Sequence, residues 1–414
     1  MRLPVTIVAI GLVAASLGPT LRAVRPAPPA GLVIITLDTT RADRLPIYGY
    51  SGVTTPAIDS VANRGVVFDD AETVAPLTLT AHTSVFTGLY PPHHGVRENT
   101  NRLLSSDHPT LAEIVHTHGF RTAAFVGSAV LAADRGLSRG FDVYDDGGAP
   151  GAPTPHRRPG ADVVDRANAW IRSLDHGVPF FLWVHLYDVH APQALPLEFR
   201  RVYGDRYEGG IAYADAQIGR LLDALRDRGT LDKTVVVIAG DHGESLGEHG
   251  EKDHGLLVYQ STMRVPLIIV APGLPPRRLS MPTSLVDVLP TVLDLFGMRA
   301  PDVDGRSAVP AVHGADPPER LIYGESTYPL HFGLSPLRMI RDGQFKFIDA
   351  AKPELYDLER DPVEQQNVAD KHLATVSALC RKLQGMSTGA AQDVGPRLSP
   401  DRLRALEALG YVNR

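Results

Sequence analysis

Apolar residues are grouped in two ways along this chain, in short unbroken runs and in longer segments with helical spacing. The unbroken runs are rich in β-branched residues, which is typical of strands buried on both faces of a parallel sheet. Such strands are predicted at residues 32–37, 66–68, 122–126, 179–185, 233–239 and 265–270. Helices are predicted between them, at residues 55–65, 110–118, 162–173, 208–228 and 286–296. This alternation predicts a doubly wound α/β sheet flanked by helices.

The pattern changes near residue 301. Short candidate strands at residues 321–324, 337–341 and 345–348 follow one another closely, and two charged helices are predicted near 370–383 and 400–409. Strands grouped in this way predict a smaller α+β subdomain with an antiparallel sheet. We therefore divide the folded part of the chain into a large α/β domain, residues 31–300, and a C-terminal subdomain, residues 301–414.

The N-terminus has a different pattern, in which Arg2 precedes an apolar run at residues 5–17. A basic residue before a short apolar run is typical of a secretory signal. The run is shorter than the roughly 20 residues that span a bilayer as a helix. We expect residues 1–23 to be a signal peptide or an uncleaved membrane anchor, followed by a linker at residues 24–30. The expected location is periplasmic or extracellular.

The amino-acid composition argues against some partners and excludes some kinds of cross-link and metal site. The chain has 414 residues, 43% of them hydrophobic, and a net charge of -6. This balance gives no general electrostatic reason to bind nucleic acid. One cysteine, Cys380, excludes both an intrachain disulfide and a cluster of thiolate metal ligands.

Residues 74–97 place a hydroxyl residue where a loop is expected to lead into a helix. Pro76 favours extended backbone before it, and the following apolar segment ends at Gly88. A helix N-terminus is therefore expected beside Thr78, where unpaired N–H groups and the helix dipole favour an anion. Taken alone, this stretch favours a simpler interpretation, in which Thr78 or Thr80 is only an N-cap.

Polar side chains gather directly after three of the apolar strands. In an open α/β sheet, the carboxyl ends of the strands form the ligand crevice. A single Asp in such a place is usually a helix cap, and a single His is usually a satisfied core or surface group. Repetition at three strand ends favours a functional site instead. The residues concerned are Asp38, His185, Asp188, His190, Asp241 and His242.

Asp38, Asp241 and His242 offer two carboxylates and one imidazole, a donor set suited to a divalent cation with an open position. Such a cation could bind the Thr78 oxygen, lower its pKa and make it a nucleophile at neutral pH. It would also offset the charge of a tetrahedral oxyanion ester. The expected substrate is therefore a small anionic ester.

Several ordered motifs resemble the sulfatase family of the alkaline phosphatase superfamily. They are LVIITLDTTRADRLPIYGY, VAPLTLTAHTSVFTGLYPPHHGVREN, PFFLWVHLYDVHAP, VVVIAGDHGESLGEHGEKDHG and ELYDLERDPVEQQN. The resemblance implies an alkaline-phosphatase-like mixed sheet, a metal bound by Asp38, Asp241 and His242, and Thr78 at the nucleophile position. By the same resemblance, Asn99 contacts the substrate, while His190 and His254 bind the ester anion or assist the leaving group.

The nucleophile motif departs from the family. Sulfatases carry Cys or Ser, any residue, Pro or Ala, any residue, and Arg, and the first residue is oxidised to formylglycine. Here the corresponding residues run from Thr78 to His82. Oxidation of threonine would give a ketone rather than an aldehyde, so formylglycine is not expected. His82 takes the place of the arginine, and we assign it to substrate binding.

The metal ligands depart from the family as well. Thr39 stands where many sulfatases have a second Asp, and His242 stands where many have Asn. Fewer carboxylates and more imidazole favour manganese or zinc over calcium. One metal site is expected, and a second one near Asp188, His190 and His254 is left open.

These features predict a metal-dependent hydrolase of phosphate or sulfate esters that uses Thr78 as the nucleophile. A phosphate mono- or diester is favoured, because a plain threonine sulfate ester has no easy exit. Three alternatives remain: an arylsulfatase-like sulfuric ester hydrolase, an envelope phosphotransferase and a catalytically silent binding protein. Substrate specificity is expected to lie in the loops at residues 147–160 and 191–206.

Overall fold

The computed structural model describes residues 29–99, 103–148, 157–316 and 319–386. The predicted signal peptide or anchor, nearly all of the predicted linker and the predicted helix at residues 400–409 lie outside these ranges. Within them, no helix combines the length and the apolar character needed to cross a membrane.

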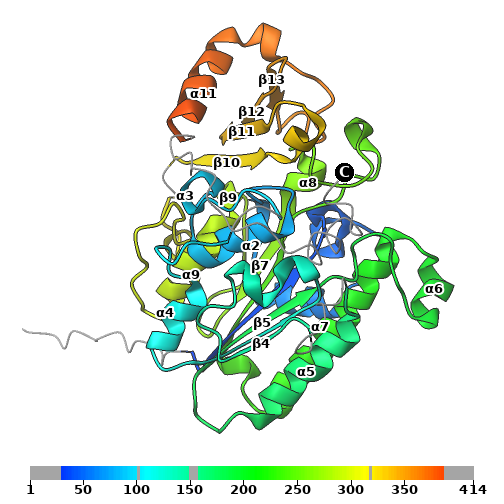
Figure 1. Ribbon diagram of the computed structural model, residues 1–414, viewed down its shortest axis with the longest axis vertical. Helices are drawn as coiled ribbons and strands as arrows, with labels where there is room; N and C mark the ends of the chain where they lie inside the picture. Colours follow the sequence, from blue (N-terminus) through cyan, green and yellow to red (C-terminus); the bar gives the residue numbers. More distant parts are fainter. Residues whose placement is uncertain (1–28, 100–102, 149–156, 317–318, 387–414) are drawn as a thin grey trace, which may run out of the picture.

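A mixed sheet forms the centre of the large domain (Figure 1). Among the described residues it has nine strands, in the order β4-β3-β5-β1-β6-β7-β2-β8, with β9 paired to β2. Strands β4, β3, β5, β1 and β6 are parallel, whereas β7 is antiparallel to both β6 and β2. The strands are β1 (Gly31–Leu37), β2 (Val66–Glu72), β3 (Arg121–Val126), β4 (Val143–Asp145), β5 (Phe180–Leu186), β6 (Thr234–Gly240), β7 (Arg264–Val270), β8 (Arg277–Leu279) and β9 (Thr283–Ser284).

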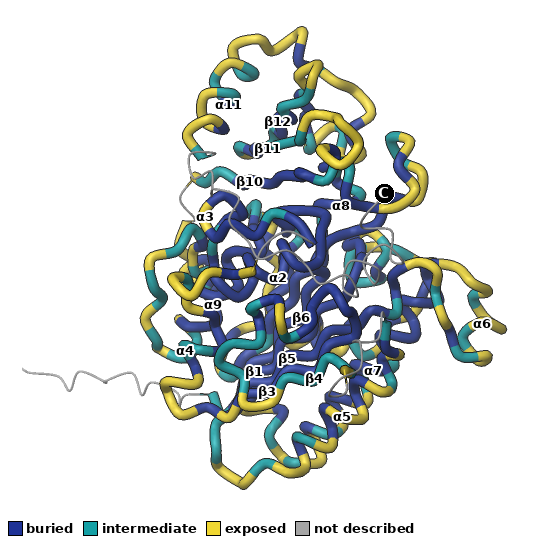
Figure 2. Tube along the Cα trace, viewed as in Figure 1, coloured by how far each residue is buried: buried dark blue, intermediate teal, exposed yellow. Residues whose placement is uncertain are grey.

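Helices cover both faces of this sheet, as the predicted doubly wound fold requires. Val33 and Ile35 of β1 pack with α1 (Pro56–Ala62), α5 (Gly160–Ser173) and α7 (Tyr207–Asp227). Leu32 and Ile34 point to the opposite face, where they share a core with α2 (Thr78–Thr87), α4 (Leu111–Thr117) and α9 (Val288–Leu295). Because successive side chains of a strand alternate between faces, both faces of β1 are apolar. The central strands are accordingly buried along their length (Figure 2).

The C-terminal subdomain is a separate antiparallel sheet, as predicted. Its strands β10 (Leu321–Ser326), β11 (Leu337–Asp342), β12 (Phe345–Asp349) and β13 (Glu354–Asp357) pair in chain order, and α11 (Leu373–Met386) packs against β11 and β12. Arg341 of β11 bonds to Asp70 and Glu72 of the large domain, with Nη1 distances of 2.7 Å to each. The two sheets are thereby joined through a charged contact.

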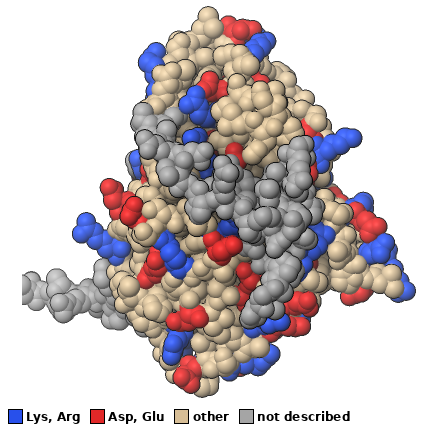
Figure 3. All heavy atoms as spheres, in the orientation of Figure 1, with Lys and Arg blue, Asp and Glu red and all other residues tan. Residues whose placement is uncertain are grey.

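Short helices complete the described structure. They are α3 (Pro91–His94), α6 (Leu197–Tyr203), α8 (Gln260–Met263) and α10 (Val309–Val312). The helix predicted at residues 286–296 begins instead with a 3-10 turn, Leu285–Asp287, before α9. On the surface, acidic and basic side chains are interspersed over the face in Figure 3, in keeping with the small net charge.

Candidate active site

The three predicted strand ends lie at one edge of the sheet. Strands β5, β1 and β6 are neighbours, and their register pairs Leu37 with both Leu186 and Gly240. Asp38 and Asp241 each follow directly on these paired positions. The Asp38 carboxylate also meets the side chain of β5, since its Oδ2 lies 3.1 Å from Nε2 of His185.

Thr78 is the first residue of α2, and its side chain points towards this edge. The N-cap position is Leu77, whose side chain makes no capping bond. Oγ1 of Thr78 lies 3.5 Å from Asp38 Oδ2 and 3.2 Å from His242 Nε2. Thr80 Oγ1 is buried and has no hydrogen-bond partner among the described residues. The simple N-cap interpretation of Thr78 or Thr80 is therefore wrong, because contacts distant in sequence determine where the Thr78 hydroxyl points.

The donor atoms of Asp38, Asp241 and His242 lie within 4.8 Å of one another, and all three residues are buried. Asp38 Oδ1 and Asp241 Oδ2 have no hydrogen-bond partner in the described part of the chain. Burial raises the pKa of both carboxyl groups, and the charge of Asp38 raises the pKa of Asp241 further. His242 donates from Nδ1 to the Gly243 carbonyl at 3.0 Å, which leaves a lone pair on Nε2. This set of unpaired donors fits a divalent cation.

The Asn99 side chain lies beside the N-terminus of α2, although Asn99 itself comes after that helix in the sequence. Its Oδ1 accepts a hydrogen bond from the Leu79 backbone N–H at 2.9 Å, which satisfies one of the unpaired groups of the helix N-terminus. Its Nδ2 is buried without a partner among the described residues. The predicted contact between Asn99 and the substrate stays a prediction.

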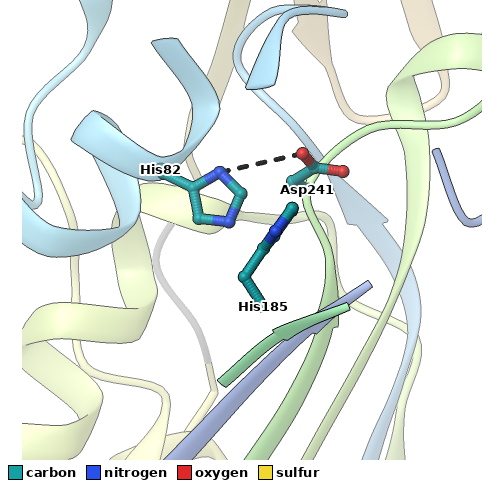
Figure 4. Close-up of side chains that lie close together, drawn as sticks. All are labelled: His82, His185 and Asp241. Carbon is teal, nitrogen blue, oxygen red and sulfur yellow. Dashed lines mark ion pairs between the residues drawn. The ribbon is translucent and has the colours of Figure 1, made fainter. Parts of the chain in front are cut away.

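His82 is fully buried, and its ring points towards Asp241 (Figure 4). Its Nδ1 donates to the Thr78 carbonyl at 2.7 Å, and its Nε2 accepts from Thr36 Oγ1 at 2.9 Å. Burial, and then the nearby His185, lower the pKa of His82 well below its usual value, so the ring is neutral. Since both ring nitrogens bond within the protein, His82 fixes the backbone at Thr78. Its assignment to substrate binding stays a prediction.

His185 belongs to the site, although its place after a strand was the only feature of the sequence that pointed to it. Burial lowers its pKa to about 3, so the ring is neutral and Nε2–H donates to Asp38. Its Nδ1 has no partner among the described residues. Figure 4 shows its ring beside His82 and Asp241. His185 therefore fixes the orientation of the Asp38 carboxylate.

His190 and His254 meet across the site, with their Nε2 atoms 3.2 Å apart. The His254 ring also lies beside His242, with 4.3 Å between ring centroids. Burial, followed by the charge of His254, lowers the pKa of His190 to about 3. The structure thus brings these two predicted residues next to the Asp38, Asp241 and His242 group.

Asp188 does not join them. Its Oδ1 accepts from the Gly160 N–H at 2.9 Å, at the start of α5, and burial raises its pKa to about 6. Arg157, which the sequence did not single out, lies closer to the site. It donates to the His190 carbonyl at 2.8 Å. Burial raises the pKa of Asp38, and the positive charge of Arg157 partly opposes this rise. Arg157 belongs to the 147–160 loop to which substrate specificity was assigned.

Thr39 has a left-handed backbone with φ of 50°, which is rare for a β-branched residue. Its N–H donates to Asp241 Oδ1 at 3.1 Å. Its Oγ1 is buried and has no hydrogen-bond partner among the described residues. Strain of this kind is typical of a functional site, where surrounding contacts hold a residue in place.

Comparisons with known proteins identify related sequences and structures. The family described as Sulfatase matches residues 31–298, and a second one, described as N-sulphoglucosamine sulphohydrolase, C-terminal, matches residues 247–388. Arylsulfatase K of Xenopus laevis is 26% identical over 450 residues, covering 86% of this chain and 82% of the relative. Choline-sulfatase of Rhizobium meliloti is 38% identical over 170 residues, which cover 40% of this chain and only 32% of the relative.

Solved structures share the fold. The phosphonate monoester hydrolase of Agrobacterium radiobacter superposes with a TM-score of 0.74 at 22% identity, covering 88% of this chain and 96% of that one. A protein solved with its substrate D-glucosamine-2-N,6-O-disulfate has a TM-score of 0.74 at 20% identity, covering 88% of this chain and 98% of that one. At this level of identity the likeness shows the fold alone.

Proposed function

This chain belongs to the sulfatase family and is an ester-hydrolysing enzyme, and from that premise we propose that it hydrolyses small anionic phosphate esters with Thr78 as the nucleophile. The observation that carries this proposal is the position of Thr78 Oγ1, 3.5 Å from Asp38 Oδ2 and 3.2 Å from His242 Nε2. The hydroxyl stands at the N-terminus of a ten-residue helix, where the backbone dipole favours a bound anion.

Asp38, Asp241, His242 and the Thr78 hydroxyl would hold the divalent cation. When bound, such a cation lowers the pKa of a coordinated hydroxyl and offsets the charge of an anionic ester. Manganese or zinc suits two carboxylates and an imidazole better than calcium does. The neighbouring residues hold this arrangement: His185 orients Asp38, and His82 holds the Thr78 carbonyl.

In the proposed reaction, the Thr78 hydroxyl loses its proton and its oxygen attacks phosphorus. The bond from phosphorus to the alcohol oxygen breaks, and the leaving oxygen takes up a proton to depart as the alcohol. The protein is left with a threonine phosphate ester. Water then cleaves this ester, releases phosphate and restores the hydroxyl. We assign His190 and His254, which lie 3.2 Å apart beside the metal ligands, to contact with the ester anion or the leaving alcohol, and the unpaired Nδ2 of Asn99 to contact with the substrate.

Sulfate ester hydrolysis is the second candidate, because the named relatives include a choline-sulfatase and an arylsulfatase. A formylglycine hydrate can expel sulfate by collapsing to an aldehyde, whereas a threonine sulfate ester cannot. The named structural relatives include a phosphonate monoester hydrolase, which supports chemistry at phosphorus in this fold. We therefore rank phosphate esters above sulfate esters.

The test is a substrate panel on purified protein, stripped of metal and then reconstituted with Mn²⁺, Zn²⁺ or Ca²⁺. Aryl phosphate monoesters, diesters, phosphonate monoesters and aryl sulfates are compared. We expect hydrolysis at phosphorus that depends on added metal. Faster turnover of aryl sulfate would overturn the phosphate preference. Transfer to an added alcohol in place of water would indicate a phosphotransferase, and inactivity on the whole panel would indicate a silent binding protein.

We also propose that residues 1–23 direct export to the periplasm or the extracellular space. The apolar run at residues 5–17 after Arg2 supports this. Fractionation of cells that express the chain with and without residues 1–23 tests it. Retention of the full chain in the cytoplasm would contradict the proposal, and recovery in the membrane fraction would indicate an uncleaved anchor.

A further inference from the structure

A chain of hydrogen bonds connects the interior of the large sheet to the backbone of Thr78. Trp183 of β5 donates from Nε1 to Oγ1 of Thr36 in β1 at 3.0 Å. The same Oγ1 lies 2.9 Å from Nε2 of His82, and Nδ1 of His82 lies 2.7 Å from the Thr78 carbonyl oxygen. All four residues are buried, with at most 1% of any of them exposed. The chain therefore runs wholly inside the protein.

The two ends of this chain determine the direction of every bond in it. An indole N–H can only donate, so Thr36 Oγ1 accepts from Trp183 and has its own proton to give to His82 Nε2. A carbonyl oxygen can only accept, so the proton of the His82 ring is on Nδ1. Both ends thus require the same neutral imidazole, with a lone pair on Nε2 and a proton on Nδ1.

Packing holds the members of the chain in place on the α2 face of the sheet. The Trp183 ring lies 4.6 Å from the Phe86 ring and 5.3 Å from the His82 ring, measured between centroids. Phe86 and His82 are four residues apart on α2, so they share one side of that helix. The indole of Trp183 therefore contacts α2 directly, and it reaches the same helix again through Thr36.

From this geometry we propose that Thr36 and Trp183 are positioning residues for the nucleophile. They act through His82, whose ring they hold in one orientation and with its proton on one nitrogen. The inference rests on the proposed role of Thr78, and it adds two residues from the interior of the sheet to the groups on which the reaction depends.

Placement matters because Thr78 Oγ1 lies between two groups of the site, 3.5 Å from Asp38 Oδ2 and 3.2 Å from His242 Nε2. Misplacement of a reacting group by about 1 Å can lower a rate by about 100-fold. Leu77, at the N-cap of α2, makes no side-chain capping bond. The bond from His82 to the Thr78 carbonyl therefore holds a helix end that lacks its own cap.

Removal of the Thr36 hydroxyl tests the proposal. Thr36→Val keeps the shape of the side chain but removes the donor to His82 Nε2. We expect kcat on the best ester of the substrate panel to fall about 10- to 100-fold, as it does when a group that orients an active site is lost. KM should change by less than about twofold, because the proposed role concerns the reacting hydroxyl rather than substrate binding. Thr36→Ser restores the donor and should recover most of kcat.

Thr122→Val is the matched control for a merely structural effect. Thr122 is a fully buried threonine of β3, and its Oγ1 donates to the Gly140 carbonyl at 2.7 Å. We expect this substitution to lower stability in urea unfolding without changing kcat. A hydroxyl at Thr36 that served stability alone would behave in the same way.

NMR of protein labelled with ¹⁵N-histidine tests the chain without reference to activity. The signals of His82 are identified by their loss in His82→Gln. In the wild type we expect a neutral ring with its proton on Nδ1. The Nε2 signal should move in Thr36→Val and return in Thr36→Ser, because the lone pair loses and regains its donor.

Trp183→Phe covers the case in which Thr36→Val does not fold. It removes the first donor of the chain but leaves the Thr36 hydroxyl, which can still donate to His82. We therefore expect the same changes in kcat and in the Nε2 signal, but smaller ones than in Thr36→Val.

The outcomes separate this inference from the proposed function. A proton on Nε2 of His82 in the wild type, or a normal kcat in folded Thr36→Val, would overturn the positioning role. The expected NMR changes in a protein that is inactive on every ester would uphold the hydrogen-bond chain and overturn the proposed function.

Discussion

The hydroxyl oxygen of Thr78 lies 3.2 Å from Nε2 of His242, so the first residue of α2 meets the end of β6. The orientation is fixed from both sides. Nδ1 of His242 donates to Gly243, and the Thr78 carbonyl accepts from His82. A reactive hydroxyl and a metal ligand are thus positioned by two elements that are far apart in the sequence.

Replacement of Thr78 tests its role as the nucleophile. Thr78→Ala should lower turnover by about 10⁴-fold or more, since loss of a nucleophile removes the covalent route. Thr78→Ser should keep most of it, and neither variant should abolish metal binding, because Asp38, Asp241 and His242 remain. Thr80→Ala is the matched control, a buried threonine of the same helix whose hydroxyl has no partner among the described residues. Near-normal turnover in Thr78→Ala would rule out Thr78 as the nucleophile.

Thr39 offers a test of metal preference. Its backbone N–H already bonds to Asp241, and Asp tolerates the left-handed backbone at this position. Thr39→Asp adds a carboxylate beside the donor group, so we expect the affinity for Ca²⁺ to rise relative to Mn²⁺. Calorimetric titration with each ion measures the ratio. Thr39→Asn, which has the same shape without the charge, should leave it unchanged; an equal shift in both variants would exclude the carboxylate as the cause.

The apolar runs predicted the central strands, and the polar residues after them predicted where the site lies. The signal was strong there because a parallel strand buried on both faces has few polar residues until it reaches the crevice. The apolar pattern did not indicate in which direction each strand runs. Residues 265–270 have the same apolar character as residues 233–239, yet β7 runs antiparallel to β6.

Side-chain roles depended on contacts that no local pattern contains. Thr78 looked like a helix cap because a hydroxyl before a helix usually is one, whereas Asp38 and His242 determine its actual orientation. His185 stands at a strand end, as the pattern predicts, but its role depends on its bond to the neighbouring Asp38. Arg157 reaches the site from a surface loop, and composition alone does not place such a loop.

The contact between the two sheets can be measured as stability. Arg341 pairs with the buried Glu72 carboxylate; burial raises the pKa of Glu72, but the Arg341 charge opposes this and the net pKa is lowered. Arg341→Met should destabilise the protein by about 3 kcal/mol, because it leaves a buried charge without its partner. Arg338→Met, which removes a partly exposed pair with Asp349, should cost less than about 1 kcal/mol. Urea unfolding compares the two, and equal losses would contradict this interpretation.

A pH-dependent contribution to stability is expected at Asp215 of α7. Its carboxyl accepts the Ile58 N–H at 2.8 Å and the Ala57 N–H at 3.2 Å, at the start of α1. These bonds favour the ionised form, but burial has the larger effect and raises the pKa from 3.8 to about 6. The folded state therefore holds a proton that the unfolded state has released between about pH 4 and pH 6.

Because the folded state holds this proton, the stability of the protein falls as the pH rises. Stability contributed by Asp215 is fully present below about pH 4 and is lost as the pH rises through about 6, with a total of about 3 kcal/mol. Asp215→Asn cannot ionise, and its amide oxygen can still accept the Ile58 N–H. The wild type should therefore lose stability relative to Asp215→Asn across this window. Urea unfolding at pH 4, 5, 6 and 7 measures the difference, with the exposed Asp232→Asn as the control. A difference that stays constant with pH would show that Asp215 is ionised throughout, and that the N–H groups of α1 outweigh its burial.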